Sequence, residues 1–174
     1  MKTEERLSSL EVALNNELRE REFYLKNAAK TKNPLGKIMF ERIGDEELEH
    51  YERLKQLHEK WKRGEQWPET VPLVVQGTTV RDMLAHIVKN AEEMPPDDKN
   101  DLKAVRTAIA FEAKGAAFYA ELGKGVSDAK EKAFFNLLAQ IENEHYLTLR
   151  DTEEYLTDPA SWYRRREHHS LDGA

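Results

Sequence analysis

Four glutamates and two histidines stand at positions where a helical core would ordinarily carry Leu or Ile. They are Glu17, Glu47, His50, Glu112, Glu142 and His145. A buried carboxylate is costly unless it is paired, hydrogen-bonded or bound to a metal. Two of the glutamates precede a histidine by three residues, and this Glu-x-x-His spacing places both side chains on one face of a helix. One Glu from each of two helices and a Glu-x-x-His pair from each of two others is a ligand set for two metal ions in a bundle. Oxygen and imidazole donors without sulfur favour iron or manganese over structural zinc.

The same pattern occurs twice in the chain at one fixed offset. Pairs that are 95 residues apart are Glu17 and Glu112, Tyr24 and Tyr119, Glu47 and Glu142, and His50 and His145. A single Glu-x-x-His is weak in a chain this rich in Glu, but recurrence at a shared offset predicts a site with approximate two-fold symmetry. The alternative is that these polar residues pair only with one another. Four buried acids facing two histidines would then need more positive charge than the residues supply.

Helical periodicity identifies the elements that must carry these side chains. We expect helices at about 4–30, 35–63, 101–123 and 128–157. Asn33-Pro34 separates the first two, Gly123 and Gly125 mark the turn between the last two, and Asp158-Pro159 ends the fourth. These breaks predict two helix pairs, each joined by a short loop.

The connection between the two pairs, about 64–100, is long enough to carry the chain from one end of a bundle to the other. A short helix is expected to begin at a Thr79 cap and to end at Pro95-Pro96. The prediction is therefore an all-α, ferritin-like four-helix bundle with a crossover between its second and third helices. We assign residues 1–158 to this bundle, with helix pairs 4–63 and 101–157, and 159–174 to a C-terminal tail.

Composition excludes several classes of protein. The 174 residues carry a formal net charge of −6 and no basic stripe, so nucleic acid is not an expected partner. The absence of cysteine excludes disulfides, thiolate-held clusters and a cysteine nucleophile. No signal peptide or stretch of membrane-spanning length is evident. We expect a cytoplasmic protein without a membrane partner.

The segments ELREREFY, DEELEHY, FEAKGAAFY and IENEHY resemble the rubrerythrin family over residues of about 5–157. The resemblance implies a non-haem di-iron centre that reacts with hydrogen peroxide or dioxygen. It implies the six residues above as metal ligands, with Tyr24 and Tyr119 hydrogen-bonded to ligand carboxylates. It also implies a homodimer, in some members with exchanged helices.

Two departures from that family matter. Full-length rubrerythrins carry a rubredoxin module that holds iron on four cysteines, so this chain would take electrons from a separate donor, such as a rubredoxin-like protein. Rubrerythrins also carry an additional Glu one turn after the third-helix ligand, and that position here is Gly115. Its counterpart on the first helix is Glu20, which either takes a similar role or is a surface acid. The sequence favours a surface acid.

The resulting functional hypothesis is a di-iron oxidoreductase that reduces hydrogen peroxide. The alternatives are a ferroxidase or other iron-handling protein, a catalase-like centre with two manganese ions or mixed metals, and a non-catalytic metal-binding bundle. The remaining histidines (His58, His86, His168 and His169) are interpreted as non-ligands. The three tryptophans (Trp61, Trp67 and Trp162) are expected to seal the bundle ends and to anchor the crossover and the tail.

Overall fold

The computed structural model describes residues 3–65, 99–158, 160–162 and 164. Its four long helices are α1 (Thr3–Ala28), α2 (Pro34–Lys62), α4 (Lys99–Gly125) and α5 (Ala129–Thr157). The predicted all-α bundle is therefore confirmed. None of the helices in these described ranges is apolar enough, over sufficient length, to cross a membrane.

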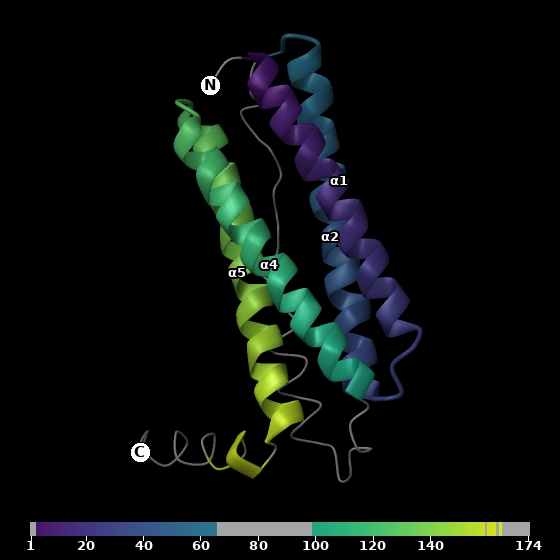
Figure 1. Cartoon of the computed structure of the whole chain (residues 1–174). Helices are drawn as coiled ribbons and strands as arrows, with labels where there is room; N and C mark the ends of the chain where they lie inside the picture. Colours follow the sequence, from purple (N-terminus) through teal and green to yellow (C-terminus); the bar gives the residue numbers. More distant parts are fainter. Residues whose placement is uncertain (1–2, 66–98, 159, 163, 165–174) are drawn as a thin grey trace, which may run out of the picture.

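The helices form two antiparallel hairpins that lie against each other (Figure 1). α1 packs on α2, and α4 packs on α5. α2 and α4 run in the same direction, so the chain leaves α2 at one end of the bundle and enters α4 at the other. This is the helix order expected of a bundle with a crossover. The predicted short helix after Thr79, and His86 within it, lie outside the described residues, as do His168 and His169.

Local signals set the helix ends. Pro34 is the first residue of α2, and the Asn33 side chain accepts a hydrogen bond from the Gly36 amide at 3.3 Å. Asp128 caps α5 by accepting from two amides of its first turn. Asp158 is the C-cap of the same helix. These ends agree with the sequence reading.

Gly123 lies inside α4, which continues to Gly125 instead of ending at the first glycine. A Cβ on Gly123 would lie 2.7 Å from Oδ1 of Asn136 on α5. The glycine therefore permits close approach of the two helices next to their turn. Breaking the helix is not its role, and for this reason the predicted end at 123 was two residues early.

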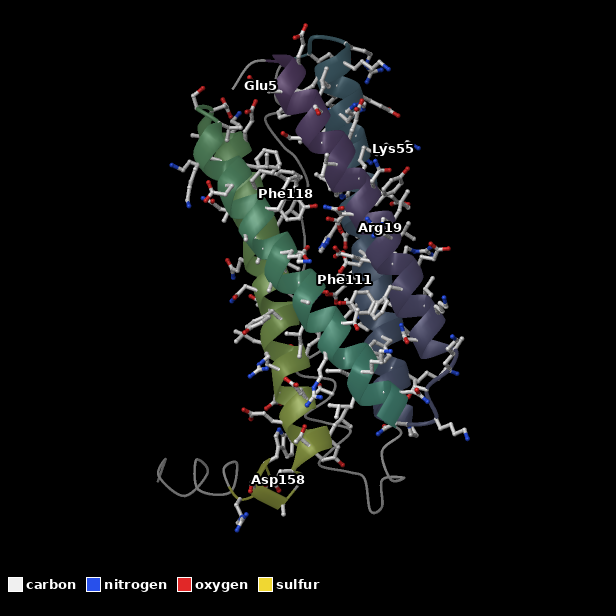
Figure 2. All side chains as sticks on the ribbon, viewed as in Figure 1. Glu5, Arg19, Lys55, Phe111, Phe118 and Asp158 are labelled. Atoms are coloured by element: carbon white, nitrogen blue, oxygen red, sulfur yellow. The ribbon has the colours of Figure 1, made fainter. Side chains whose placement is uncertain are left out.

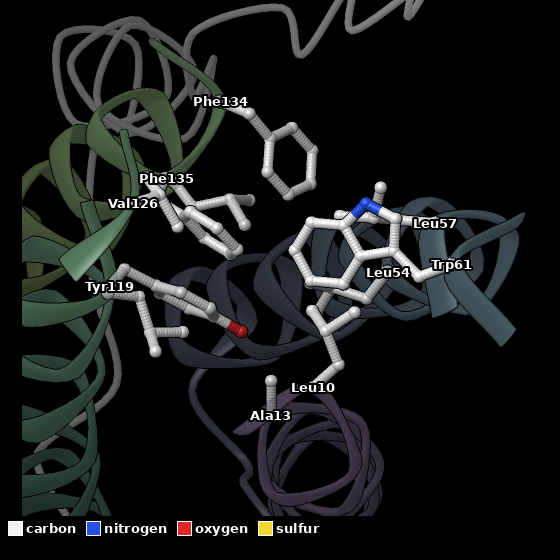
Figure 3. Close-up of a cluster of buried hydrophobic side chains, with 11 residues drawn as sticks. Leu10, Ala13, Leu54, Leu57, Trp61, Tyr119, Val126, Phe134 and Phe135 are labelled. Carbon is white, nitrogen blue, oxygen red and sulfur yellow. The ribbon is translucent and has the colours of Figure 1, made fainter. Parts of the chain in front are cut away.

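Two apolar clusters fill the ends of the bundle and leave the polar residues between them. One cluster, drawn in Figure 3, includes Leu10, Leu54, Trp61 and Phe135. The other is built around Met39, Phe40, Ile43, Val105 and Leu149. Each cluster also contains one tyrosine, Tyr119 in the first and Tyr24 in the second. The bundle is thus sealed by apolar packing on both sides of its polar centre.

Two of the tryptophans lie at the ends, as expected. Trp61 is buried within the first cluster. Trp162 is also buried, stacks edge-on against Tyr155, and donates a hydrogen bond from Nε1 to Asp151 at 2.9 Å. The third, Trp67, lies outside the described residues.

Candidate metal centre

The structure brings all six chemistry-bearing residues together in the middle of the bundle. Each is at most 2% exposed. Their donor atoms form two groups, and within each group the atoms lie within 4.8 Å of one another. The first group is Glu17, Glu47, His50 and Glu142, and the second is Glu47, Glu112, Glu142 and His145. Glu47 and Glu142 belong to both groups, so they stand where bridging carboxylates between two ions would stand.

Both histidines turn the same ring nitrogen toward this cluster. Nδ1 of His50 lies 3.1 Å from carboxylate oxygens of both Glu17 and Glu47. Nδ1 of His145 lies 3.4 Å from Glu112 and 3.5 Å from Glu47. The two rings are 6.1 Å apart between centroids and nearly parallel, at 23°. The arrangement matches the approximate two-fold symmetry predicted from the 95-residue offset.

The two tyrosines cross over between the halves. The Tyr24 hydroxyl of α1 donates a hydrogen bond to Glu112 on α4. The Tyr119 hydroxyl of α4 donates a hydrogen bond to Glu17 on α1. Each tyrosine therefore fixes a carboxylate of the opposite hairpin, and burial together with these carboxylates raises the pKa of both phenols. Both hydroxyls stay protonated and keep donating.

Protons balance the charge of the cluster when no cation is present. Burial and the neighbouring Glu47 raise the pKa of Glu17 to about 8, and burial also raises the pKa of Glu142. Burial by itself would lower the pKa of His50, but the surrounding carboxylates, Glu47 first, raise it. Glu47 moves the other way: burial opposes its ionisation, yet the two histidines hold its pKa below the usual range. The cluster therefore holds protons that a bound cation can displace.

Several buried atoms of the cluster lack a hydrogen-bond partner, which makes it a fit for metal ions. Among the described residues these atoms include Glu47 Oε1, Glu112 Oε2, both Glu142 carboxylate oxygens and His145 Nδ1. Buried polar atoms of this kind are rare in folded proteins and call for an explanation such as an ion. The donors are oxygens and imidazole nitrogens, which suit divalent first-row metals.

Glu20 is not the surface acid that the sequence favoured. Its side chain is only partly exposed, and it lines a cavity between α1 and α4. Burial, followed by the charges of Glu47, Glu112 and Glu17, raises the pKa of Glu20 to about 10. The carboxyl group therefore lies beside the cluster and holds its proton at neutral pH when no cation is bound.

The cavity has a volume of about 390 Å³. Its lining consists of four pairs with the 95-residue offset: Asn16 and Phe111, Arg19 and Lys114, Glu20 and Gly115, and Phe23 and Phe118. Arg19, Phe111 and Phe118 are labelled in Figure 2, on the neighbouring helices α1 and α4. A Cβ on Gly115 would lie 2.9 Å from Oε2 of Glu142. Gly115, which lines the cavity, therefore lies directly against a carboxylate of the cluster.

Sequence reasoning missed Glu46, which precedes a predicted ligand. Its Oε2 lies 2.7 Å from His145 Nε2, the ring nitrogen that faces away from the cluster. The histidine donates this hydrogen bond when Nδ1 is left free for a cation. Glu46 stands one position off the core stripe, so periodicity gave no signal for it. The 95-residue offset did contain a signal, because it pairs the charged Glu46 with the apolar Ile141.

His58 was interpreted as a non-ligand and lies apart from the two groups. Its Nε2 is 3.4 Å from Glu11 near the end of the bundle, and its side chain is 16% exposed.

The bundle order and the buried carboxylate–histidine cluster define a ferritin-like protein with a candidate metal centre. A family model described as Rubrerythrin matches residues 8–153. The chain belongs to this family, which confirms the resemblance seen in its motifs. Among solved structures, a protein of Pyrococcus furiosus titled "Hypothetical Protein Pfu-1136390-001" is similar, with 24% identity over 87% of this chain and 90% of that one. Its TM-score of 0.66 shows a shared fold. No curated protein matches the chain.

Proposed function

We propose that the protein is a non-haem di-iron oxidoreductase that reduces hydrogen peroxide to water with electrons from a separate donor protein. The observation that carries the proposal is that two four-residue groups share Glu47 and Glu142. Two ions held in this way would be bridged by carboxylates, and the unpartnered oxygens of the cluster supply the contacts they need.

Iron is a metal that the donor set suits and that the family favours. The cluster offers carboxylate and imidazole groups, and the chain has no cysteine to provide thiolate. Family membership supports redox chemistry at a di-iron centre. A pair of bound ferrous ions supplies two electrons, which is the number that reduction of one peroxide to two waters requires.

The protein residues would control access and protons. The cavity between α1 and α4 would admit a small molecule next to the cluster, because its lining residue Gly115 lies directly against Glu142. The Glu20 carboxyl group lines this cavity and can hold a proton there. Peroxide reduction consumes two protons, so a protonatable group at this place is useful to the reaction.

Anaerobic stopped-flow absorption tests the proposal. Protein loaded with ferrous iron is mixed with hydrogen peroxide or with dioxygen at equal concentration. Peroxide should oxidise the iron much faster than dioxygen does. Equal or slower oxidation by peroxide contradicts the peroxidase assignment, and oxygen evolution from peroxide by a manganese-loaded protein would favour a catalase instead.

The size of the assembly separates the proposal from iron storage. Storage needs a hollow shell of many subunits, whereas a peroxidase of this size needs none. Light scattering of the purified protein should give a small oligomer. A shell of many chains that accumulates ferric iron would contradict the proposal.

A further inference from the structure

The two histidines of the cluster differ on the side that faces away from it. His145 Nε2 is hydrogen-bonded to Glu46 at 2.7 Å. His50 Nε2 is buried, and no hydrogen-bond partner for it exists among the described residues. The residue that corresponds to Glu46 in the second hairpin is Ile141, which is 1% exposed. The symmetric frame therefore holds one supported and one unsupported imidazole.

The supporting carboxylate is itself held in place. Glu46 lies 3.6 Å from the guanidinium Nε of Arg42, one turn earlier on α2, and its side chain is 15% exposed. The counterpart of Arg42 is Leu137. An Arg–Glu–His chain thus runs from the surface to the cluster on the His145 side. At the corresponding positions on the His50 side, both charged residues are replaced by aliphatic ones.

This difference acts on the affinity for cations. A carboxylate that accepts the outer N–H fixes the ring orientation and the tautomer in which Nδ1 carries the lone pair. It also makes that nitrogen a stronger donor to a metal ion. When His50 binds a cation through Nδ1, its outer N–H is buried with no acceptor among the described residues, and this lowers the net gain.

We propose that Glu46 is a positioning residue that makes the two metal positions unequal. The position formed by Glu47, Glu112, Glu142 and His145 binds the first divalent cation. The position formed by Glu17, Glu47, Glu142 and His50 binds the second, more weakly. This inference rests on the proposed function only insofar as the cluster holds two cations, and it requires no particular oxidant.

Titration of the metal-free full-length protein with Co²⁺ tests the order of filling. Calorimetry and the visible absorption of bound cobalt should show two resolved steps, the first at least about tenfold tighter. Proton NMR of the same samples detects exchangeable ring N–H signals shifted by the cobalt. The signal protected by Glu46 should appear with the first equivalent and the other ring N–H with the second.

Substitution of Glu46 should act on the first step. Glu46→Ala removes the acceptor and should weaken that step by about 10–100-fold, so that the two steps merge and the protected N–H signal disappears. Glu46→Gln keeps an uncharged acceptor and should fall between wild type and Ala. The matched control is Glu41→Gln, which removes the same charge from an exposed site on the same helix and should change neither step.

Three outcomes overturn the inference. The first is a wild-type titration with two indistinguishable binding steps. The second is an NMR titration in which the ring N–H of His50 appears before that of His145. The third is a Glu46→Ala variant in which both binding steps are weakened equally. If the Ala variant does not fold, Glu46→Gln and the wild-type NMR order still decide. Uptake of two cobalt ions in identical steps defeats this inference alone. Failure to bind cobalt defeats the proposed function with it.

Discussion

The two helix hairpins carry the same ligands in the same register but differ in the residues next to them. Each hairpin contributes one Glu, one Glu-x-x-His pair and one tyrosine that reaches across to the other half. The hairpin of α1 and α2 adds two further acids, Glu20 and Glu46. The hairpin of α4 and α5 has Gly115 and Ile141 at those positions.

This difference separates the residues that form the two metal positions from the residues that make the two positions unequal. Shared residues define the two four-residue groups and the apolar clusters on either side. The unshared acids stand next to the cluster at two places: Glu20 lines the cavity, and Glu46 lies behind His145. A symmetric frame can thus give two metal positions of unequal properties.

The largest effect is expected from residues that belong to both groups. Glu47→Gln or Glu142→Gln removes a shared ligand and should lower the metal content from two ions per chain to none. Glu17→Gln or Glu112→Gln removes a ligand of one group and should leave one ion. Elemental analysis after desalting measures this. Retention of both ions by Glu47→Gln breaks the assignment of shared ligands.

The stability of the metal-free protein should fall as pH rises, whereas the additional stability that bound metal provides should increase. The folded-state pKa of Glu17 is raised from 4.5 to about 8, so between these values the folded chain keeps a proton that the unfolded chain has released. Stability of the metal-free protein therefore falls as pH rises through this window. The raised pKa values of His50 and His145 act in the same direction, because stability present below the unfolded pKa is lost as pH rises through the folded one.

Thermal unfolding in chelator should show this fall as a decrease in Tm of several degrees between about pH 6.5 and 8.5. Metal displaces those protons, so the metal-loaded protein should gain stability relative to the metal-free protein over the same range. A metal-free protein whose Tm rises with pH would contradict the protonation pattern of the cluster.

An intermediate effect on metal binding is expected from substitutions at Gly115 and Glu20, the unlike pair that lines the cavity. Gly115→Ala places a Cβ 2.9 Å from Glu142 Oε2 and 3.3 Å from its Cδ, so the shared carboxylate must shift. We expect metal affinity to fall by roughly tenfold, since such overpacking costs about 1–3 kcal/mol. Glu20→Ala at the paired position should leave two ions bound.

Gly36→Ala is the control for the added methyl group, because it lies in α2 away from the cluster, with Thr31 Oγ1 at 3.2 Å as its nearest contact. Calorimetric metal titration compares the three variants. Unchanged affinity in Gly115→Ala would show that Glu142 need not keep its position.

The smallest effect is expected from the tyrosines, and it should be equal in the two halves. Tyr24→Phe and Tyr119→Phe each remove one hydrogen bond to a carboxylate of the opposite hairpin. Each should weaken metal binding by about 1 kcal/mol, or roughly fivefold. Paired titrations measure the two values. A tenfold difference between them would place the asymmetry in the tyrosines as well as in the added acids.

The helices and the six cluster residues were readable from the sequence because both obey simple periodicities. Apolar residues at steps of three and four gave the helices, and the 95-residue offset brought the polar exceptions into register. Gly123 misled because a glycine that allows close helix packing looks the same in sequence as one that ends a helix.

Glu46 and Glu20 were not readable in the same way. The partner of Glu46 is 99 residues away on α5, so the contact depends on how the two hairpins are rotated against each other. The burial of Glu20 depends on the cavity that α1 and α4 leave between them. Both properties arise from packing between hairpins, which single-helix periodicity does not encode.

Anomalous X-ray diffraction at the iron edge tests the central claim most directly. Crystals of the protein, loaded with ferrous iron without oxygen, should show two peaks about 3.5–4 Å apart, one next to His50 Nδ1 and one next to His145 Nδ1. Glu47 and Glu142 should contact both peaks. A single peak, or iron bound elsewhere with the six side chains paired only to one another, would contradict the two-metal centre.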